Sequence, residues 1–167
     1  MSTLTEWTQS HFQVIYAAAS EDAFNAAIDA FFSPNVEMYN NEKKMTREDA
    51  REEIAQRWRG AQRVDVKWEN SIEVPKEGEG LTGKEAGLVS GFFVVTRSLR
   101  FRVRAAPMQQ LNYVTFNGRF VDPAVEPDEQ GDRRRITYLY QTSIDKAAPL
   151  HLHPIPNAPI KEDETKA

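Results

Sequence analysis

The chain has 167 residues, 40 % of them hydrophobic, and a formal net charge of -4, which suits a single domain with one sizeable core. The acidic balance argues against a nucleic-acid partner, because such a partner calls for an excess of lysine and arginine on one face. Cysteine is absent, which excludes disulfides, thiolate metal sites and a cysteine nucleophile. The sequence shows no signal-peptide pattern and no apolar run of ~18 residues, so we expect a cytoplasmic protein without a membrane span.

Two helices are predicted before residue 35. A capping box between Thr3 and Glu6 begins the first helix, which we expect to end near Ala19. Ser20 is a suitable N-cap for the second helix, and Pro34 stops it. The stripes that give these helices a buried face are Leu4, Trp7, His11, Val14, Ile15 and Ala18 in the first, and Phe24, Ala27, Ile28 and Phe31 in the second.

A short hairpin and a third helix follow. Val36 to Tyr39 is predicted as a strand, Asn40-Asn41 tolerates the positive φ of a tight turn, and Lys43 to Met45 returns as a second strand. Thr46 is then the N-cap of the third helix. The remaining signals of this helix are Asp49 in a capping box, the staple pair Met45 and Ala50, the stop at Gly60, and the apolar stripe Ala50, Ile54, Trp58 and Ala61.

From residue 64 onward the chain is predicted to form long strands. Residues 64–74 alternate strictly, whereas residues 86–97 are apolar at both parities, as in a central strand covered on both sides. Residues 99–105 either continue that strand past a bend or stand at the edge of the sheet. Residues 109–122 and 133–146 form the last two strands. On the first of these strands Val64, Val66, Trp68, Ile72 and Val74 are expected to share the buried face.

Charged and glycine-rich or proline-rich segments separate and end these strands. Residues 75–85 and 125–132 are predicted surface loops. Residues 147–167 contain four prolines and a charged end, so we expect an extended or disordered tail. The predicted organisation is therefore one domain over residues 1–146 and a tail over residues 147–167.

The order of the elements resembles the NTF2-like superfamily, whose members include SnoaL-like polyketide cyclases, ketosteroid isomerase and scytalone dehydratase. The segment AFFSPNVEMYNNEKKMTREDAREEI carries the best local match, and GDRRRITYLYQTSIDK is similar to the superfamily's final strand. The resemblance covers roughly residues 4–146. It implies an α+β fold in which three N-terminal helices pack in a strongly curved, mostly antiparallel sheet, shaped as a cone with a cavity inside.

The resemblance also indicates where catalytic residues would lie. In isomerase-like and cyclase-like members an Asp or His on the strand after the second helix is the general base. The matching position here is near Tyr39, a phenol whose unperturbed pKa of about 10 makes it a poor base at neutral pH. His11, on the stripe of the first helix, is the other weak catalytic candidate. Its plainer interpretation is a core or rim histidine held by hydrogen bonds.

A set of aromatic and amide residues forms the candidate ligand site. These residues fall on parities that can share the concave face, and aromatic rings with a few polar tips suit a small-molecule cavity as well as a packed core. The ligand-binding candidates are Trp68, Phe92, Asn112, Phe116, Tyr138 and Tyr140.

Two further groups of residues, a histidine pair and several arginines, have side chains that suit ligand binding. His151 and His153 lie on one side of an extended segment, which suits a metal, but no third ligand is near, so neither a metal site nor a cofactor is predicted. The arginines either bind an anionic ligand or form solvated strand faces beside acidic neighbours. These arginines are Arg100, Arg102, Arg104 and Arg133 to Arg135.

Two functions follow from these observations. The first is a cyclase, isomerase or dehydratase for an apolar oxygenated ring compound, with Tyr39, Tyr138 or Asn112 polarising a carbonyl or positioning water. The alternative is a non-enzymatic dimeric binding or interaction module without a catalytic site. In the first case the partner is a small apolar ligand, and in neither case is it a nucleic acid or a membrane.

The strands that are apolar on both faces predict a homodimer joined sheet to sheet, because a bare apolar patch on the outer face needs cover. We expect one parity to fill the cone and the other to form the interface. The expected inward set is Phe92, Val94, Phe116 and Tyr140, and the expected outward set is Val89, Phe93, Val95, Leu111, Tyr113 and Leu139.

Overall fold

The computed structural model describes residues 2–78, 85–103, 106–120, 126 and 131–149, without the side chains of residues 101–103, 106 and 107. The predicted tail from residue 150 onward, with His151 and His153, lies outside the described residues, as do Arg104 and most of the two predicted loops. The elements are α1 (Leu4–Tyr16), α2 (Glu21–Phe31), β1 (Phe32–Asn40), β2 (Lys43–Met45), α3 (Arg47–Arg59), β3 (Ala61–Pro75), β4 (Gly87–Val103), β5 (Ala106–Phe120) and β6 (Ile136–Ala147).

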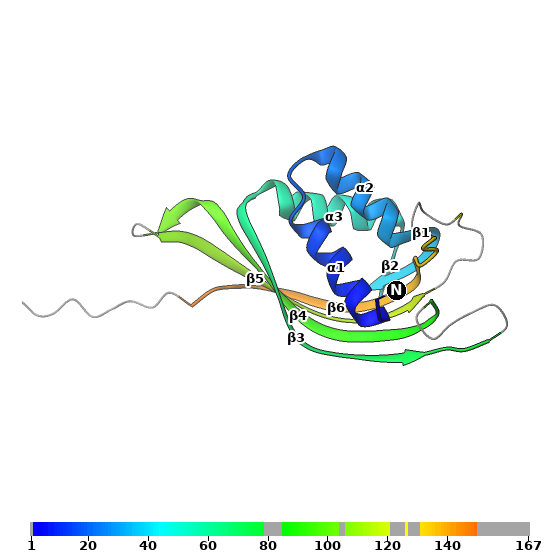
Figure 1. Ribbon diagram of the computed structural model, residues 1–167. Helices are drawn as coiled ribbons and strands as arrows, with labels where there is room; N and C mark the ends of the chain where they lie inside the picture. Colours follow the sequence, from blue (N-terminus) through cyan, green and yellow to red (C-terminus); the bar gives the residue numbers. More distant parts are fainter. Residues whose placement is uncertain (1, 79–84, 104–105, 121–125, 127–130, 150–167) are drawn as a thin grey trace, which may run out of the picture.

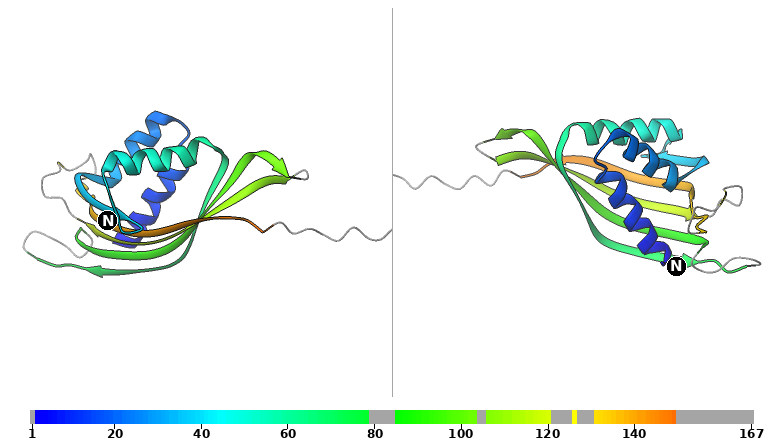
Figure 2. Two further views of the ribbon diagram at one scale, coloured as in Figure 1. Left: turned by 180° about the vertical axis from the view of Figure 1, so that it is seen from behind. Right: turned by 45° about the horizontal axis from the view of Figure 1, so that its top comes forward.

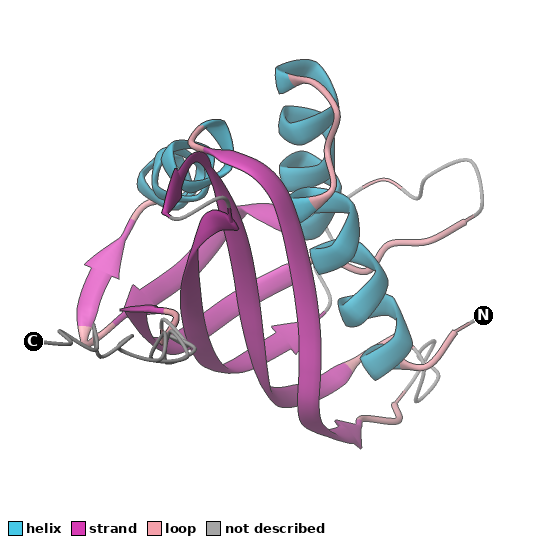
Figure 3. Cartoon of the chain, turned by 90° about the vertical axis from the view of Figure 1, so that its left-hand side faces the viewer, coloured by secondary structure: helices cyan, strands magenta, loops and turns pink. Residues whose placement is uncertain are grey.

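The six strands form one strongly curved sheet in the order β2-β1-β6-β5-β4-β3. The β1–β6 pair is parallel and every other pair is antiparallel. The three helices cover one face of this sheet, and none of the described helices covers the other face (Figure 1; Figure 2). The sheet is open, with β2 and β3 as its edges (Figure 3). The predicted α+β class and the predicted mostly antiparallel sheet are therefore confirmed.

The helices begin at the predicted caps. The hydroxyl groups of Thr3, Ser20 and Thr46 each accept a hydrogen bond from a backbone N–H of the first turn, at 3.0 to 3.2 Å. Around Thr46 the capping box is complete, because the Asp49 carboxylate accepts from the Thr46 N–H at 2.9 Å, and this bond holds the pKa of Asp49 below its usual value. The predicted stripe of α2 is buried in full.

The buried face of α1 differs from the predicted stripe. Phe12 and Tyr16 are buried, whereas Val14 is 57 % exposed and His11 is only half-buried. Apolar residues occur on more than one side of this helix, so their spacing did not decide which side is buried. The larger aromatic side chains bury more apolar surface, and they occupy the core.

Two strands carry irregularities that reverse the predicted side-chain directions. In β3 the register shifts between Trp68 and Asn70, so Trp68 packs against the core while Ile72 and Val74 are 64 % and 59 % exposed. In β6 a shift opposite Arg119 and Phe120 has the same effect. A bulge inserts one residue, and an insertion of one residue sends every later side chain to the opposite face.

The parity predicted for β4 and β6 was wrong. The residues expected at the outer face, Val89, Phe93, Val95 and Leu139, are all buried beneath the helices. On β4 both parities are apolar, so the sequence pattern offered no means of choosing between them. The side-chain directions predicted for β5 were correct. Asn112 and Phe116 point inward, and Tyr113 points outward.

Strand β4 is continuous to Val103, which confirms the first of the two alternatives for residues 99–103. Its register with β5 shifts between Ser98 and Arg102, near the predicted bend. Pro107 lies in β5, which begins at Ala106. Beyond the ends of β3 and β6 the β4–β5 hairpin projects from the body of the molecule (Figure 1).

Aromatic rings fill the centre of the concave face. Phe12 of α1 lies within 4.7 to 5.8 Å, between ring centroids, of rings from α2, β3, β4 and β5. Gly91 makes this packing possible, because a Cβ at this position would lie 2.8 Å from the Phe116 ring and 2.9 Å from the Trp68 ring. The four partners of Phe12 are Phe31, Trp68, Phe93 and Phe116.

Candidate ligand cavity beneath α3

A small cavity lies beyond Phe12, between α1, α3 and the inner face of the sheet. The space open to the centre of a water-sized sphere is about 20 Å³, which is enough for one or two waters. Its apolar lining includes Phe32, Met38, Ile54, Phe93, Val114 and Leu139. Its polar lining is Tyr16, Glu53, Arg57, Asn112, Gln141 and Ser143.

Asn112 is the most unusual residue of this lining. It lies on β5, is 2 % exposed, and its Nδ2 has no hydrogen-bond partner among the described residues. A buried donor without a partner costs roughly 1–3 kcal/mol, and most buried polar groups in native proteins avoid this cost. Asn112 therefore presents a hydrogen-bond donor to the cavity at the expense of the stability of the fold.

Tyr16 supplies a second polar group. It is the last residue of α1 and is buried, with no hydrogen-bond partner for its hydroxyl among the described residues. Burial raises the pKa of Tyr16 to about 12, because the phenolate would lose its hydration. At neutral pH the phenol therefore keeps its proton and is a hydrogen-bond donor.

Four charged side chains lie beside these donors. Arg97 of β4 is 7 % exposed and donates to Asp145 of β6 at 3.1 Å. Arg57 of α3 pairs with Glu53 at 2.7 Å and with Asp145 at 3.5 Å. Asn40 of β1 donates to the same Glu53 oxygen at 3.3 Å. Two positive and two negative groups thus compensate one another at the end of the concave face that α3 covers.

Of the predicted ligand-binding residues, only Asn112 lines the cavity. Trp68 and Phe116 point inward, but they pack into the aromatic core around Phe12. The other three, Phe92, Tyr138 and Tyr140, lie on the outer face of the sheet. There Phe92 stacks with Tyr113 at 6.4 Å, and the rings of Tyr138 and Tyr140 lie 6.2 and 6.1 Å from Tyr39.

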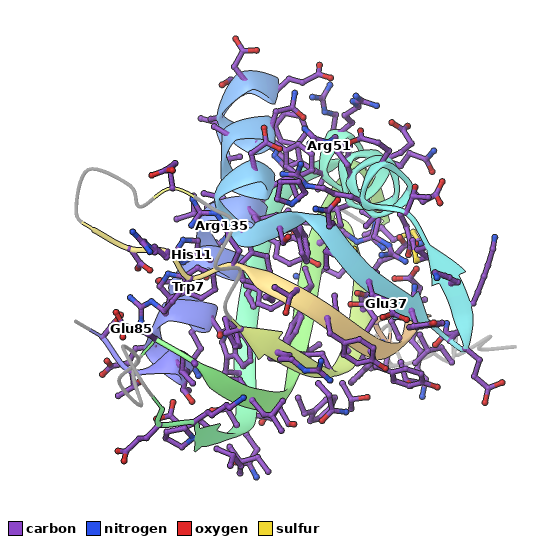
Figure 4. The ribbon with its side chains drawn as sticks, turned by 90° about the vertical axis from the view of Figure 1, so that its right-hand side faces the viewer. Trp7, His11, Glu37, Arg51, Glu85 and Arg135 are labelled. Carbon is purple, nitrogen blue, oxygen red and sulfur yellow. The ribbon has the colours of Figure 1, made fainter. Side chains whose placement is uncertain are left out.

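Tyr39 points away from the cavity. Its hydroxyl donates to Glu37 at 2.8 Å on the outer face of β1, where Figure 4 labels Glu37. This hydrogen bond raises the pKa of Tyr39, so the phenol is even less able to lose its proton near neutral pH. On β1 the side chains that line the cavity are Phe32 and Met38.

His11 lies at the other end of the molecule from Glu37, beside Trp7 and Arg135 (Figure 4). Its ring stacks on Trp7 with centroids 3.9 Å apart, and its Nδ1 lies 2.9 Å from the Trp7 carbonyl oxygen. Burial lowers the pKa of His11, against the opposing effect of that hydrogen bond, so the neutral form is favoured. His11 does not line the cavity.

The arginines before β6 have unequal environments. Arg134 is buried, donates to Asp132 at 2.7 Å and to the Ser2 carbonyl oxygen at 2.8 Å, and lies over the Trp7 ring at 5.5 Å. Burial opposes the ionisation of Asp132, but the bonds from Arg134 outweigh it and lower the pKa of Asp132. Arg134 therefore fixes the N-terminal segment to the body. Arg133 is exposed.

The sequence analysis missed seven polar residues at or beside this site: Tyr16, Glu53, Arg57, Gln141 and Ser143 in the lining, and Arg97 and Asp145 beside it. They come from α1, α3, β4 and β6, and no fixed spacing links them. One signal was present, since Tyr16 follows Phe12 by four residues on a helix and so shares its face. Arg97 shares its parity with Val95 and Phe93, but the two-sided apolar pattern of β4 concealed this.

Comparisons with known proteins were made with the sequence and with the structure. No protein-family model and no curated protein matches the sequence. Among solved structures, a proposed aromatic ring hydroxylase from Novosphingobium aromaticivorans matches with a TM-score of 0.55 and 8 % identity over 84 % of this chain and 90 % of that chain. A proposed scytalone dehydratase from the same organism matches with a TM-score of 0.53 and 10 % identity over 93 % and 99 %.

A hexachlorocyclohexane dehydrochlorinase, LinA type 2, matches with a TM-score of 0.50 and 11 % identity over 92 % of this chain and 97 % of that chain. The chain has the NTF2-like fold. The named NTF2-like proteins differ in the reaction that their names imply, so their likeness shows the fold and not an activity.

Two further observations concern the described residues alone. None of their helices is long and apolar enough to cross a membrane. They also contain no group of three or more His, Asp or Glu side chains that is placed to hold a metal ion.

Replacing Asn112 by Leu should stabilise the unliganded protein by about 1 kcal/mol, because the substitution removes an unpartnered buried donor and keeps a side chain of similar volume. The measurement is the free energy of unfolding in urea. Asn117→Leu, at an exposed position on the same strand, is the control and should change stability less. If Asn112→Leu lowers the stability by 1 kcal/mol or more, the amide has a structural role and its donor is not an excess one.

Proposed function

We propose that the cavity binds a small apolar molecule that carries a hydrogen-bond-accepting oxygen, such as a ketone. The observation that carries this proposal is the Asn112 amide, which is almost fully buried, lines the cavity and has an unpartnered Nδ2. Polar groups that weaken a fold in this way are typical of functional sites. A ligand oxygen at this point would satisfy the donor.

The free hydrogen-bonding groups at the site indicate the kind of ligand. The Asn112 Nδ2 is an unpartnered donor in the cavity lining, and the protonated Tyr16 hydroxyl can donate as well. The ligand must therefore accept hydrogen bonds. Because the charges of Arg57 and Arg97 are already compensated by Glu53 and Asp145, the site does not require an anionic ligand. Together with the apolar walls, this favours a neutral carbonyl compound.

Binding of prodan, a neutral fluorescent naphthyl ketone, tests this proposal. Asn112→Leu should weaken prodan binding about tenfold, as expected for the loss of one buried hydrogen bond. The control ligand is N,N-dimethyl-2-naphthylamine, which has the same ring system without the acyl group, and its affinity should be the same for both proteins. Equal binding of prodan to wild type and Asn112→Leu would show that Asn112 does not recognise the carbonyl.

An enzymatic function is the second candidate, and Glu53 is the observation that favours it. Its carboxylate lines the same cavity, and one oxygen accepts the bonds from Arg57 and Asn40. The other oxygen has no partner among the described residues and is available as a base. Glu53 would take a proton from the carbon beside the carbonyl, and the electron pair would move onto the carbonyl oxygen, where Asn112 and Tyr16 donate. Such a step is common to isomerases, cyclases and dehydratases.

If Glu53 is this base, the protein should accelerate the exchange of deuterium from D₂O into the methylene group beside the carbonyl of prodan, followed by NMR. Glu53→Gln should lower the exchange rate by about a hundredfold. Glu52→Gln, at the adjacent exposed position, is the matched control and should retain the rate. Prodan that binds without accelerated exchange would leave ligand binding as the function and exclude Glu53 as the base for this ketone.

We also propose that the protein forms a homodimer through the outer face of the sheet. This face presents the aromatic side chains of Phe92, Tyr113, Tyr138 and Tyr140, and next to them Ile144 is 56 % exposed. Tyr113 and Ile144 are directly opposite each other on β5 and β6. A face of this composition is larger than soluble monomers usually expose.

Wild-type protein should sediment at twice the 19.1 kDa mass of one chain, and Tyr113→Glu plus Ile144→Lys should sediment as a folded monomer. Circular dichroism checks that the variant is folded. Val14→Glu, on the exposed side of α1, is the control and should remain a dimer. A wild type that sediments as a monomer at micromolar concentration contradicts the proposal.

A further inference from the structure

The cavity and the proposed ligand differ in size. A space of about 20 Å³ holds one or two waters, whereas an apolar ring compound needs several times that room. One wall must therefore move before such a ligand can enter. Four elements supply most of the lining: α1, α3 and the strands β5 and β6.

The strands and α1 are poor candidates for the moving wall. Strands β5 and β6 are paired along their length, and their separation would break many backbone hydrogen bonds. Helix α1 carries Phe12, whose ring is held among four other rings. These walls belong to the core.

Helix α3 is packed differently. Its fully buried residues are Ala50 and Ala55, two small side chains, while Ile54 and Trp58 are only half-buried. Small side chains bury little apolar surface, so the apolar contribution that holds α3 in place is low. Charged contacts supply much of its attachment.

These contacts are unequal on the two sides of α3. On the side of α2, Arg47 and Arg51 both pair with Asp29, at 2.5 and 2.7 Å, and Arg59 pairs with Glu21 at 2.9 Å. The Trp58 indole donates to the Ala18 carbonyl oxygen at 2.9 Å.

On the side of the sheet, α3 has two polar contacts within the described part of the chain. Arg57 pairs with Asp145 at 3.5 Å, and Asn40 donates to Glu53 at 3.3 Å. Both of these α3 residues line the cavity. In polar contacts alone, the edge of α3 that borders the sheet is therefore the more weakly held one.

We propose that α3 is a lid over the cavity, which stays attached to α2 and opens along its border with β1 and β6. The Arg57–Asp145 ion pair is its latch. When this pair separates, α3 tilts away from the sheet and widens the cavity, while Arg97 holds Asp145 in place. This inference rests on the proposed function for its purpose, but the motion itself is testable without any ligand.

Hydrogen–deuterium exchange of the unliganded protein tests the latch. Arg57→Gln should speed the exchange of α3 amides about three- to fivefold, the factor expected for the loss of its two partly exposed ion pairs, to Glu53 and Asp145, and leave the amides of β4 and β5 unchanged. Arg59→Gln is the matched control. It makes the same substitution on the same helix, and it likewise breaks two ion pairs, to Glu21 and Glu52, but on the side away from the sheet.

The control should leave the exchange of the amides from Ala50 to Arg57 close to that of wild type. Equal acceleration by both variants would mean that α3 merely loses helix stability, and this result would overturn the latch. No acceleration by Arg57→Gln would overturn it as well.

Stopped-flow binding of prodan gives a second readout. If the latch gates entry, Arg57→Gln raises the association rate of prodan about three- to fivefold. Unchanged rates would exclude α3 as the entry route. If prodan fails to bind to wild type, the proposed ligand class is wrong for this probe, while the exchange experiment still decides whether α3 opens.

Discussion

The packing of aromatic rings around Phe12 is the constraint on which the rest of the structure depends. This single side chain joins α1 to α2 and to three strands of the sheet, and its partners fill the middle of the concave face. Interiors packed at this density leave no room for a ligand. The space that remains lies one helical turn further along α1, where the next inward residue is Tyr16. The location of the cavity is thus a consequence of the core.

The end of the concave face beneath α3 is polar, unlike the aromatic centre around Phe12. There the sheet places Arg97 and Asn112 at inward positions, α1 adds Tyr16, and α3 covers them with Glu53 and Arg57. Buried charges need partners, and the four ionic groups supply them to one another. Asn112 Nδ2 and the Tyr16 hydroxyl are left without partners among the described residues. The same few residues therefore weaken this end of the domain and make it suitable for a polar ligand group.

The sequence predicted the helices and the fold class well, because caps and stripes are local features. Thr3, Ser20 and Thr46 act as expected. Side-chain direction on the strands was harder to predict, since a single bulge near Trp68 reverses Ile72 and Val74, and nothing in a two-sided strand such as β4 marks the inner parity. Asn112 was found because β5 is regular around it. The other site residues lie on separate elements, which only the tertiary structure brings together.

The pairing of β1 with β6 has a consequence for how the protein folds. Strand β1 ends near residue 40, and its parallel neighbour begins at residue 136, so these strands meet only after a loop of roughly a hundred residues has closed. Contacts between residues so distant in sequence slow folding. Until β6 arrives, both β1 and β5 present an unpaired edge, which is the kind of surface on which nascent chains associate wrongly. During synthesis the sheet beneath the N-terminal helices is therefore incomplete until β6 has been made. A chaperone that shields the edges of β1 and β5 would have its greatest effect in that interval.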